Sequence, residues 1–296
     1  MFIRRLPVFE YHTPATLPEA IGLLGTYGEA GRLIAGGTDL LVAMKKREVA
    51  CSHLISLAAI EGLKGLTFDD KEGLRIGSLT TLSEIEKSDV VRQMYAPLWD
   101  AVSVMASAQV KNLATLGGNL ASAVPSADTA PPLIALGASV RLRGQTGERI
   151  CEVEDFFLGP KACCCGKDEI VTEILVPKPA PLSGGSYLKL MRRHAMDLAL
   201  VGAAVCLSVD KEKGLCTGAR VALGAVAPTP IRVPEAEEQL VGKPIGEAAA
   251  AQAGRVAGAT CRPITDLRSS LEYRCSMVEV LTRRAVMEAG KRIRGY

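Results

Sequence analysis

Two short glycine-rich segments constrain this chain more than any other feature of its sequence. Residues 32–39 read RLIAGGTD and residues 115–119 read TLGGN, so each segment places a Gly-Gly pair after an apolar stretch. Glycine tolerates positive φ and allows a close approach of the backbone to a ligand, so consecutive N–H groups can converge on an anion. A single Gly-Gly pair is most often an ordinary turn. Two pairs with polar neighbours in one chain favour a cofactor that carries a diphosphate.

The composition indicates a globular protein with a substantial core. The chain has 296 residues, of which 48% are hydrophobic, and a net charge of +3. This length is sufficient for two or three domains. Lysine and arginine are scattered and do not form a stripe with aromatic residues, which argues against nucleic-acid binding. No apolar run reaches the length of a membrane span or a signal peptide, so we expect a soluble, cytoplasmic protein.

Cysteine and histidine do not form a recognisable metal motif in the sequence. None of the nine cysteines belongs to a C-x-x-C pair. The run Cys163-Cys164-Cys165 favours a plain loop or strand over a metal or cluster, because adjacent side chains diverge. The three histidines, His12, His53 and His194, are far apart along the chain. We therefore predict no metal site, with His53 in the core or at a sheet edge and His194 on the surface.

Hydrophobic periodicity and turn residues predict an α+β chain in two parts. The predicted helices lie near residues 17–27, 40–46, 83–94, 97–106, 128–136, 235–241, 247–259 and 272–294. The predicted strands lie near residues 32–35, 53–57, 74–79, 138–143, 148–153, 170–176, 187–191, 198–209 and 219–226. Residues 177–185 contain three prolines and two glycines, which is typical of a linker. Three strands followed by helices are expected beyond it.

The sequence lacks the common motifs for catalysis by its own side chains. It contains no G-x-S-x-G elbow, no Walker loop and no G-x-G-x-x-G turn. A dinucleotide would therefore bind elsewhere than at a single Rossmann turn. A chain that binds a cofactor without an acid–base or nucleophile set of its own suits an electron relay, in which the cofactor carries the reaction.

Several segments together resemble the FAD-binding (medium) subunit of molybdenum hydroxylases, most closely the separate flavin subunit of bacterial xanthine dehydrogenases. Carbon monoxide dehydrogenase and nicotinate dehydrogenase have similar subunits. The resemblance covers almost the whole chain, and its motifs are highly specific in combination. The segments that carry it are residues 34–40 (IAGGTDL), 114–120 (ATLGGNL), 123–128 (AVPSAD), 156–161 (FFLGPK), 168–171 (DEIV), 187–189 (YLK), 192–193 (RR) and 197–199 (DLA).

The resemblance implies an α+β fold of two domains. Residues 1–177 would form an FAD-binding domain of the vanillyl-alcohol-oxidase/cresol-methylhydroxylase (PCMH) type, with FAD clamped between subdomains of about residues 1–60 and 61–177. Residues 186–296 would form a C-terminal domain like that of the carbon monoxide dehydrogenase flavoprotein, with a three-stranded sheet and a helical bundle. The predicted linker falls at the same boundary.

The resemblance also implies which residues contact FAD. Both glycine segments would hold the diphosphate and its flanks, mainly through backbone N–H groups. Asp128 would accept hydrogen bonds from the ribityl or ribose hydroxyls, whereas without the family it is typical of a helix N-cap. Met105 would lie near the isoalloxazine ring, although a core methionine fits the same pattern. The expected contacts are Arg32, Leu33, Ile34, Ala35, Gly36, Gly37, Thr38, Asp39, Met105, Thr115, Leu116, Gly117, Gly118, Asn119, Asp128, Val171 and Lys189.

Two further expectations concern the cofactors. The first glycine segment contains no histidine or cysteine, so we expect non-covalent FAD. Cys163-Cys164-Cys165 departs from the family, in which a Thr or Val and a Leu are usual at this place. The hydroxybenzoyl-CoA reductases carry an iron–sulfur cluster on this subunit through an inserted loop. This chain has no such insertion, so we expect no cluster of its own.

The function that the resemblance implies is electron transfer within a heteromeric, xanthine dehydrogenase-like molybdenum hydroxylase. A large partner subunit would hold molybdopterin, and a small one would hold [2Fe–2S] clusters. FAD on this chain would pass electrons to NAD or another acceptor, without a catalytic residue of its own. Two alternatives remain open: a stand-alone PCMH-type flavin oxidoreductase acting on its own small substrate, and an assembly subunit that has lost FAD.

Overall fold

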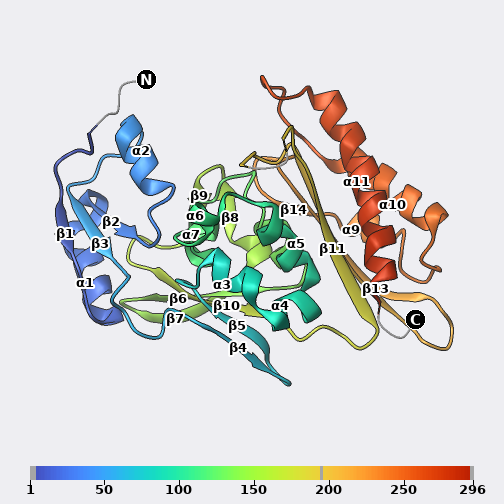
Figure 1. Cartoon of the computed structure of the whole chain (residues 1–296), viewed down its shortest axis with the longest axis horizontal. Helices are drawn as coiled ribbons and strands as arrows, with labels where there is room; N and C mark the ends of the chain where they lie inside the picture. The colour runs from blue at the N-terminus through green and yellow to red at the C-terminus, as the bar shows by residue number, and fades with distance from the viewer. Residues whose placement is uncertain (1–4, 194–195, 294–296) are drawn as a thin grey trace.

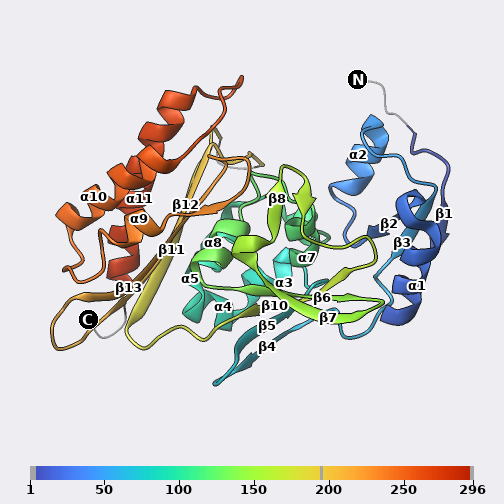
Figure 2. The same cartoon turned by 180° about the vertical axis from the view of Figure 1, so that it is seen from behind.

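The structure, a computed structural model, describes residues 5–193 and 196–293. Three main sheets follow one another along the long axis of the molecule, each with its own helices (Figures 1 and 2). We name these parts the N-terminal unit (residues 10–56), the central unit (residues 66–176) and the C-terminal unit (residues 183–291). His194 lies outside the described residues.

The N-terminal unit is built on a small parallel sheet with the strand order β1–β3–β2. Its strands are β1 (Glu10–His12), β2 (Gly31–Ile34) and β3 (His53–Ser56). Its helices are α1 (Leu17–Tyr27) and α2 (Leu40–Lys46), as predicted. Helix α1 starts at a capping box, in which the Thr16 hydroxyl accepts from the Glu19 N–H and the Glu19 carboxylate accepts from the Thr16 N–H.

The central unit contains an antiparallel sheet with the order β4–β5–β10–β6–β7, covered on one face by short helices (Figures 1 and 2). The strands are β4 (Leu66–Asp69), β5 (Gly73–Gly77), β6 (Ser139–Gly144), β7 (Gly147–Glu152) and β10 (Ile170–Val176). A small ribbon pairs β8 (Phe157–Gly159) with β9 (Ala162–Cys163). The largest hydrophobic core of the described chain lies between this sheet and its helices.

The helices of the central unit are shorter and more numerous than predicted. They are α3 (Leu82–Lys87), α4 (Asp89–Met94), α5 (Ala96–Val104), α6 (Ala108–Lys111), α7 (Leu116–Ala121) and α8 (Ala130–Ala135). The helix expected over residues 83–94 divides at Ser88, which is extended and whose hydroxyl accepts from the Val91 N–H. Helices α6 and α7, of four and six residues, are too short to produce a periodic pattern.

The C-terminal unit has a four-stranded sheet, so the prediction of three strands is wrong. The strands are β11 (Ser183–Leu190), β12 (Val201–Val209), β13 (Cys216–Gly224) and β14 (Ile231–Arg232), in that order. The fourth strand has two residues, which is too short to show alternation, and it pairs with β13 at the edge of the sheet. The helices are α9 (Pro234–Glu237), α10 (Glu247–Thr260) and α11 (Leu271–Lys291).

Strand β11 begins at Ser183, inside the stretch predicted as a linker. Gly184 of this strand lies directly against helix α11, where a Cβ atom would collide with the Ala289 carbonyl. Glycine therefore serves here to bring a strand close to a helix, because it has no side chain to separate them.

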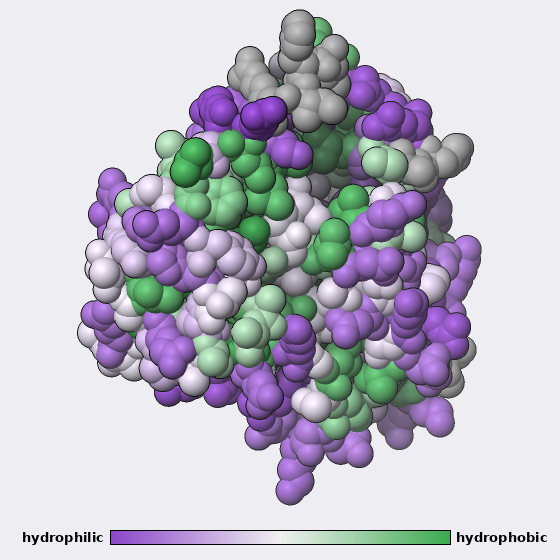
Figure 3. All heavy atoms as spheres, turned by 60° about the vertical axis from the view of Figure 1, so that its left-hand side comes forward, coloured by the Kyte–Doolittle hydropathy of each residue, from purple (hydrophilic) through white to green (hydrophobic). Residues whose placement is uncertain are grey.

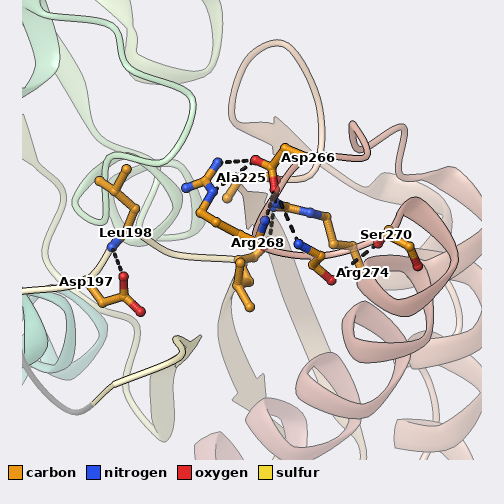
Figure 4. A network of polar contacts seen from close by, with 9 residues as sticks. Asp197, Leu198, Ala225, Asp266, Arg268, Ser270 and Arg274 are labelled. Carbon is orange, nitrogen blue, oxygen red and sulfur yellow. Dashed lines mark hydrogen bonds and ion pairs between the residues drawn. The ribbon is translucent and has the colours of Figure 1, made fainter.

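A buried arginine fixes the loop that precedes helix α11. Arg274 is 1% exposed, and its guanidinium donates to the Leu200 carbonyl at 2.8 Å and to the Asp266 carboxylate at 3.0 Å (Figure 4). Asp266 also accepts from Arg268, and these charged hydrogen bonds hold the pKa of the Asp266 carboxyl below its ordinary value. The helix, the loop and the end of the sheet are thus joined by one network.

The C-terminal sheet packs on helices α5 and α8 of the central unit. Asp100 of α5 accepts from the Tyr187 N–H at 3.0 Å and from the Arg292 guanidinium at 2.6 Å. Strand β11 is therefore held against the central unit, and side chains of one face of that strand reach it. Within the described ranges, no helix has the length and apolar character required to cross a membrane.

Candidate functional site

The first glycine segment ends strand β2 and continues as the turn to helix α2. The backbone N–H groups of that turn are free in the described part of the chain. Residues 32–34 belong to β2, and residues 35–39 form the turn that follows. Gly37 has a φ of 68°, a conformation that favours glycine. Within residues 5–193 and 196–293, the backbone N–H groups of residues 35–39 make no hydrogen bond. These consecutive donors are available to an anion.

The second glycine segment differs, because its N–H groups already have acceptors. Thr115 is the N-cap of helix α7, and its side chain accepts from the Gly118 N–H at 3.1 Å. The Leu116 and Gly117 N–H groups donate to carbonyl oxygens of residues 80 and 78 at 3.0 and 2.9 Å, and the Asn119 N–H donates to the Thr115 carbonyl at 2.9 Å. The two segments therefore differ in the backbone donors that they leave free, and their contact with FAD stays a prediction.

The structure brings the two glycine segments together in space. A Cβ atom at Gly36 would collide with the Leu113 carbonyl and would lie 3.1 Å from the Ala114 Cα. A Cβ atom at Gly118 would lie 3.8 Å from the Ala35 Cβ. The turn of the N-terminal unit thus rests on the chain that enters α7 of the central unit, and the absence of side chains at the glycines permits this approach.

Asp128 and Lys189, both expected to contact the cofactor, form a buried ion pair with Tyr187. The Asp128 Oδ2 accepts from the Lys189 Nζ and the Oδ1 accepts from the Tyr187 hydroxyl, each at 2.8 Å. The side chains of Lys189 and Asp128 are 1% and 7% exposed. Burial raises the pKa of the Asp128 carboxyl, while the charge of Lys189 opposes that rise. Burial and the neighbouring carboxylate raise the pKa of Tyr187.

Asp128 is not a helix N-cap. The N-cap of α8 is Thr129, and no side-chain capping hydrogen bond is formed there. The Thr129 hydroxyl instead donates to the Asn119 Oδ1 at 2.6 Å. This bond links Asn119 of the second glycine segment to Thr129, the residue that follows Asp128.

Three of the expected FAD contacts make no hydrogen bond to the glycine segments or to Asp128 and Lys189 in the described part of the structure. Met105 and Val171 are 8% and 7% exposed and pack in the core of the central unit. The Arg32 guanidinium donates to the carbonyl oxygens of Glu29 and Gly31, at the start of β2. Their contact with a cofactor stays a prediction.

Sequence reasoning missed two residues that shape the site. Tyr187 was not assigned a role, although residues 187 and 189 alternate along a strand and so share one face. Ser78 was not singled out, yet its backbone receives the Gly117 N–H, and a Cβ atom at Gly117 would lie 2.6 Å from the Ser78 Cβ. Nothing in the local sequence marks this residue, because the contact spans separate elements.

His12 and His53, which are far apart along the chain, are neighbours in the structure. The His12 Nε2 lies 3.1 Å from the His53 Nδ1, because β1 and β3 are neighbours in the parallel sheet. Distance along the sequence did not predict distance in space here. His53 starts β3, the central strand of the sheet, and is half-buried, so it lies neither in the core nor at a sheet edge as expected.

The cysteine run forms strand and loop, as predicted. Cys163 ends strand β9, and the Cys164 Sγ lies 3.4 Å from the Cys151 Sγ. A hydrogen bond from Cys165 lowers the pKa of Cys163 to about 6. All nine cysteines are free thiols.

The backbone donors of the first glycine segment fit a diphosphate. A diphosphate requires several hydrogen-bond donors in a small space, and residues 35–39 provide five adjacent N–H groups without other partners among the described residues. The face in Figure 3 is hollowed near its centre, where pale and hydrophobic residues gather between hydrophilic surroundings. The close approach of Gly36 to Leu113 holds the turn against the central unit.

Comparison with known proteins identifies the family. Residues 7–179 match the FAD binding domain in molybdopterin dehydrogenase, and residues 186–289 match the CO dehydrogenase flavoprotein C-terminal domain. The carbon monoxide dehydrogenase medium chain of Hydrogenophaga pseudoflava is 34% identical over 286 residues, which cover 97% of this chain and 98% of the relative. The xanthine dehydrogenase FAD-binding subunit of Escherichia coli O157:H7 is 30% identical over 280 residues, which cover 94% of this chain and 95% of the relative.

Solved structures show the same relationship. Carbon monoxide dehydrogenase from Hydrogenophaga pseudoflava, in a form that lacks the Mo-pyranopterin moiety, matches with a TM-score of 0.93 and 35% identity, over 98% of this chain and 99% of that chain. Quinoline 2-oxidoreductase from Pseudomonas putida 86 matches with a TM-score of 0.90 and 30% identity, over 97% and 98% of the two chains. The chain therefore belongs to the FAD-binding medium subunits of the molybdenum hydroxylase family, and it is an oxidoreductase subunit whose cofactor is FAD.

Proposed function

We propose that this chain transfers electrons within a heteromeric molybdenum hydroxylase. A large partner subunit would hydroxylate the substrate at molybdopterin, and a small partner would conduct electrons through [2Fe–2S] clusters. The chain would receive them at FAD and deliver them to NAD or another acceptor. The relatives named as subunits of carbon monoxide dehydrogenase, xanthine dehydrogenase and nicotinate dehydrogenase support this role.

The free backbone donors of residues 35–39 are the observation that carries the proposal. In this proposal they bind the FAD diphosphate, and Gly37 provides the backbone conformation that lets them converge. Residues 115–119 contribute a close-packed wall, since their own N–H groups are bonded within the protein. The wall lies against the turn through Gly118 and Ala35.

Asp128 would accept hydrogen bonds from ribityl or ribose hydroxyls. Each of its oxygens receives one donor in the structure, and a carboxylate oxygen can accept two. Lys189 and Tyr187 would hold the carboxylate in position and so prepare it for the ligand. FAD, when bound without a covalent link, supplies reversible electron uptake, and the residues of this chain bind and orient it.

The test begins with the purified chain and FAD. We expect one FAD per chain, released on acid denaturation, with a flavin absorbance spectrum in the native protein. A colourless chain that cannot be reconstituted with FAD would support an assembly subunit and contradict the proposal. Flavin that stays with the denatured chain would contradict non-covalent binding.

A second measurement concerns the partners. The chain alone should oxidise NADH slowly with an artificial dye, if NAD is its acceptor, and should show no hydroxylase activity. Substrate hydroxylation should appear only after the large and small subunits are added. Substrate turnover by the chain alone would instead establish a stand-alone flavin oxidoreductase.

A further inference from the structure

Glu10, His12 and His53, whose side chains are of types that bind metals, meet at the edge of the N-terminal sheet. None of them belongs to a glycine segment. Strand β1 pairs in parallel with β3, with Glu10 opposite His53. His12 lies two residues beyond Glu10 and therefore on the same face of β1. The two imidazole rings and the carboxylate come from segments about forty residues apart, so only the parallel pairing brings them together.

The distances among the three ligand atoms match the spacing of ligands around a small metal ion. The His12 Nε2 lies 3.1 Å from the His53 Nδ1, and the Glu10 Oε2 lies 3.4 Å from the His53 Nδ1 and 3.9 Å from the His12 Nε2. Tetrahedral ligands at about 2.0–2.1 Å from zinc lie about 3.3–3.4 Å from one another. An ion can therefore reach all three atoms with a small movement of the exposed Glu10 side chain.

The histidine rings are already oriented by a neighbouring aromatic residue. Tyr27, at the end of helix α1, stacks on His53 with ring centroids 3.8 Å apart and an interplanar angle of 9°. It also lies 4.9 Å from the His12 ring. Both histidine side chains are 20% exposed, whereas that of Glu10 is 72% exposed. The two rings are thus held by packing, and the Glu10 carboxylate lies on the solvent side of the group.

We propose that Glu10, His12 and His53 bind a divalent transition-metal ion of the Zn²⁺ class. Two imidazole nitrogens and one carboxylate oxygen suit zinc, whereas magnesium and calcium prefer oxygen ligands alone. The exposed side of the group leaves the fourth coordination position to water or to a ligand from a partner. The bound ion would cross-link edge strand β1 to β3. The proposal does not depend on FAD or on the proposed electron transfer.

The test is a zinc titration of the full chain by calorimetry, with three variants. We expect the wild-type protein to bind one Zn²⁺ at this site and His12→Ala to weaken that binding at least about tenfold. His53→Phe should have the same effect while it keeps a ring stacked on Tyr27. Glu10→Gln retains an oxygen of similar reach but removes the charge, so it should weaken binding less than the loss of either histidine.

The cysteines provide the matched control, because thiols also bind zinc. The double variant Cys151→Ser/Cys164→Ser should retain the zinc affinity of the wild-type protein, since these sulfurs are not ligands in the proposal. Unchanged binding in His12→Ala and His53→Phe would overturn the proposal, as would loss of the site in the cysteine variant. It would also fail if the two rings share only a hydrogen bond and zinc does not bind.

A measurement on the unmutated chain avoids any effect of substitution on folding. Zinc should shift the ring resonances of two of the three histidines in an NMR titration. The third histidine serves as the internal reference. Unperturbed His12 and His53 resonances at saturating zinc would overturn the assignment.

Discussion

The two glycine segments look alike in sequence and differ in what their backbones do. The turn at residues 35–39 keeps its N–H groups unpaired among the described residues, and Gly37 has positive φ. At residues 116–119 every N–H has an acceptor within the protein, and Gly117 fits against Ser78. Gly37 therefore belongs to a turn with free donors, while Gly117 permits close packing, as Gly36 of the first segment also does. The same dipeptide can serve binding in one place and architecture in another.

This difference makes the effects of substitution separable. Changes in the second segment and its supports should lower the stability of the FAD-free protein. Changes at Gly37 should act mainly on FAD affinity, because the N–H groups of residues 35–39 make no hydrogen bond inside the described protein. The four experiments below test this separation, beginning with the largest expected effect.

Lys189→Met removes the cation that pairs with Asp128 next to the second segment. An unpaired carboxylate would remain buried, so we expect the FAD-free protein to lose about 3–5 kcal/mol of unfolding free energy. Urea denaturation at pH 7 measures this loss. The double variant Lys189→Met/Asp128→Asn should recover part of it, because the buried charge is then absent. A single variant as stable as the wild type would show that the pair does not support this region.

The same variant has a characteristic pH dependence. Burial raises the pKa of Asp128 in the folded protein, and removal of Lys189 should raise it further. A folded-state pKa above the unfolded value favours folding with proton uptake, so the variant should regain stability as the pH falls from 7 towards the unfolded value of about 4. Urea midpoints measured across this range check the sign.

Gly117→Ala should destabilise the FAD-free protein by about 1–3 kcal/mol, since its Cβ would lie 2.6 Å from the Ser78 Cβ. Gly22→Ala is the matched control, because no atom lies within 4 Å of the added methyl group in helix α1. That control should be neutral or stabilise by up to about 1 kcal/mol. Equal stabilities of the two variants in urea would contradict a packing role for the second segment.

Gly37→Ala should weaken FAD binding about 5- to 150-fold, which corresponds to about 1–3 kcal/mol of backbone strain at positive φ. The turn can relax when no ligand holds it, so the cost should appear in the binding free energy, measured by fluorescence titration with FAD. Gly62→Ala provides the control, because Gly62 also has positive φ, 83°, and lies in open space. Its FAD affinity should equal that of the wild type.

Thr115→Val should have the smallest effect. The substitution keeps the shape of the side chain and removes the acceptor of the Gly118 N–H, which should lower stability by about 1 kcal/mol. Thr115→Ser retains the hydroxyl and serves as the control. A larger change in FAD affinity than in thermal stability would assign this segment a direct part in binding and weaken the contrast between the two loops.

Local signals predicted much of the fold because they act over a few residues. The helix near residues 17–27 and the strands near residues 138–143 and 148–153 were predicted, because the cap formed by Thr16 and Glu19 and the turn at Gln145-Thr146 are local features. Strand β14 escaped because its two residues contain no full alternation, and Ser88 divided a helix that apolar spacing alone made continuous. Each of these elements has six residues or fewer, so it spans too few repeats of its hydrophobic period to be recognised.

The candidate site was predictable in its parts and less so in its bonding. The residues indicated both glycine segments, the family resemblance implied Asp128 and Lys189, and the structure places these two in contact. Their contact with FAD stays a prediction. The sequence did not indicate which N–H groups would remain free, because their acceptors come from distant residues such as Ser78. The contact of His12 with His53 was missed for the same reason, since it depends on strand order.

The buried pair of Asp128 and Lys189 has a consequence for exchanging parts between relatives. The carboxylate belongs to the central unit, whereas the ammonium and the Tyr187 hydroxyl belong to strand β11 of the C-terminal unit. A chimera that combines this central unit with a foreign C-terminal part lacking either donor would leave a polar group buried without its partner. Recombination between homologous subunits should therefore succeed only when Asp128 and its two donors come from the same parent, or when both parents have these residues.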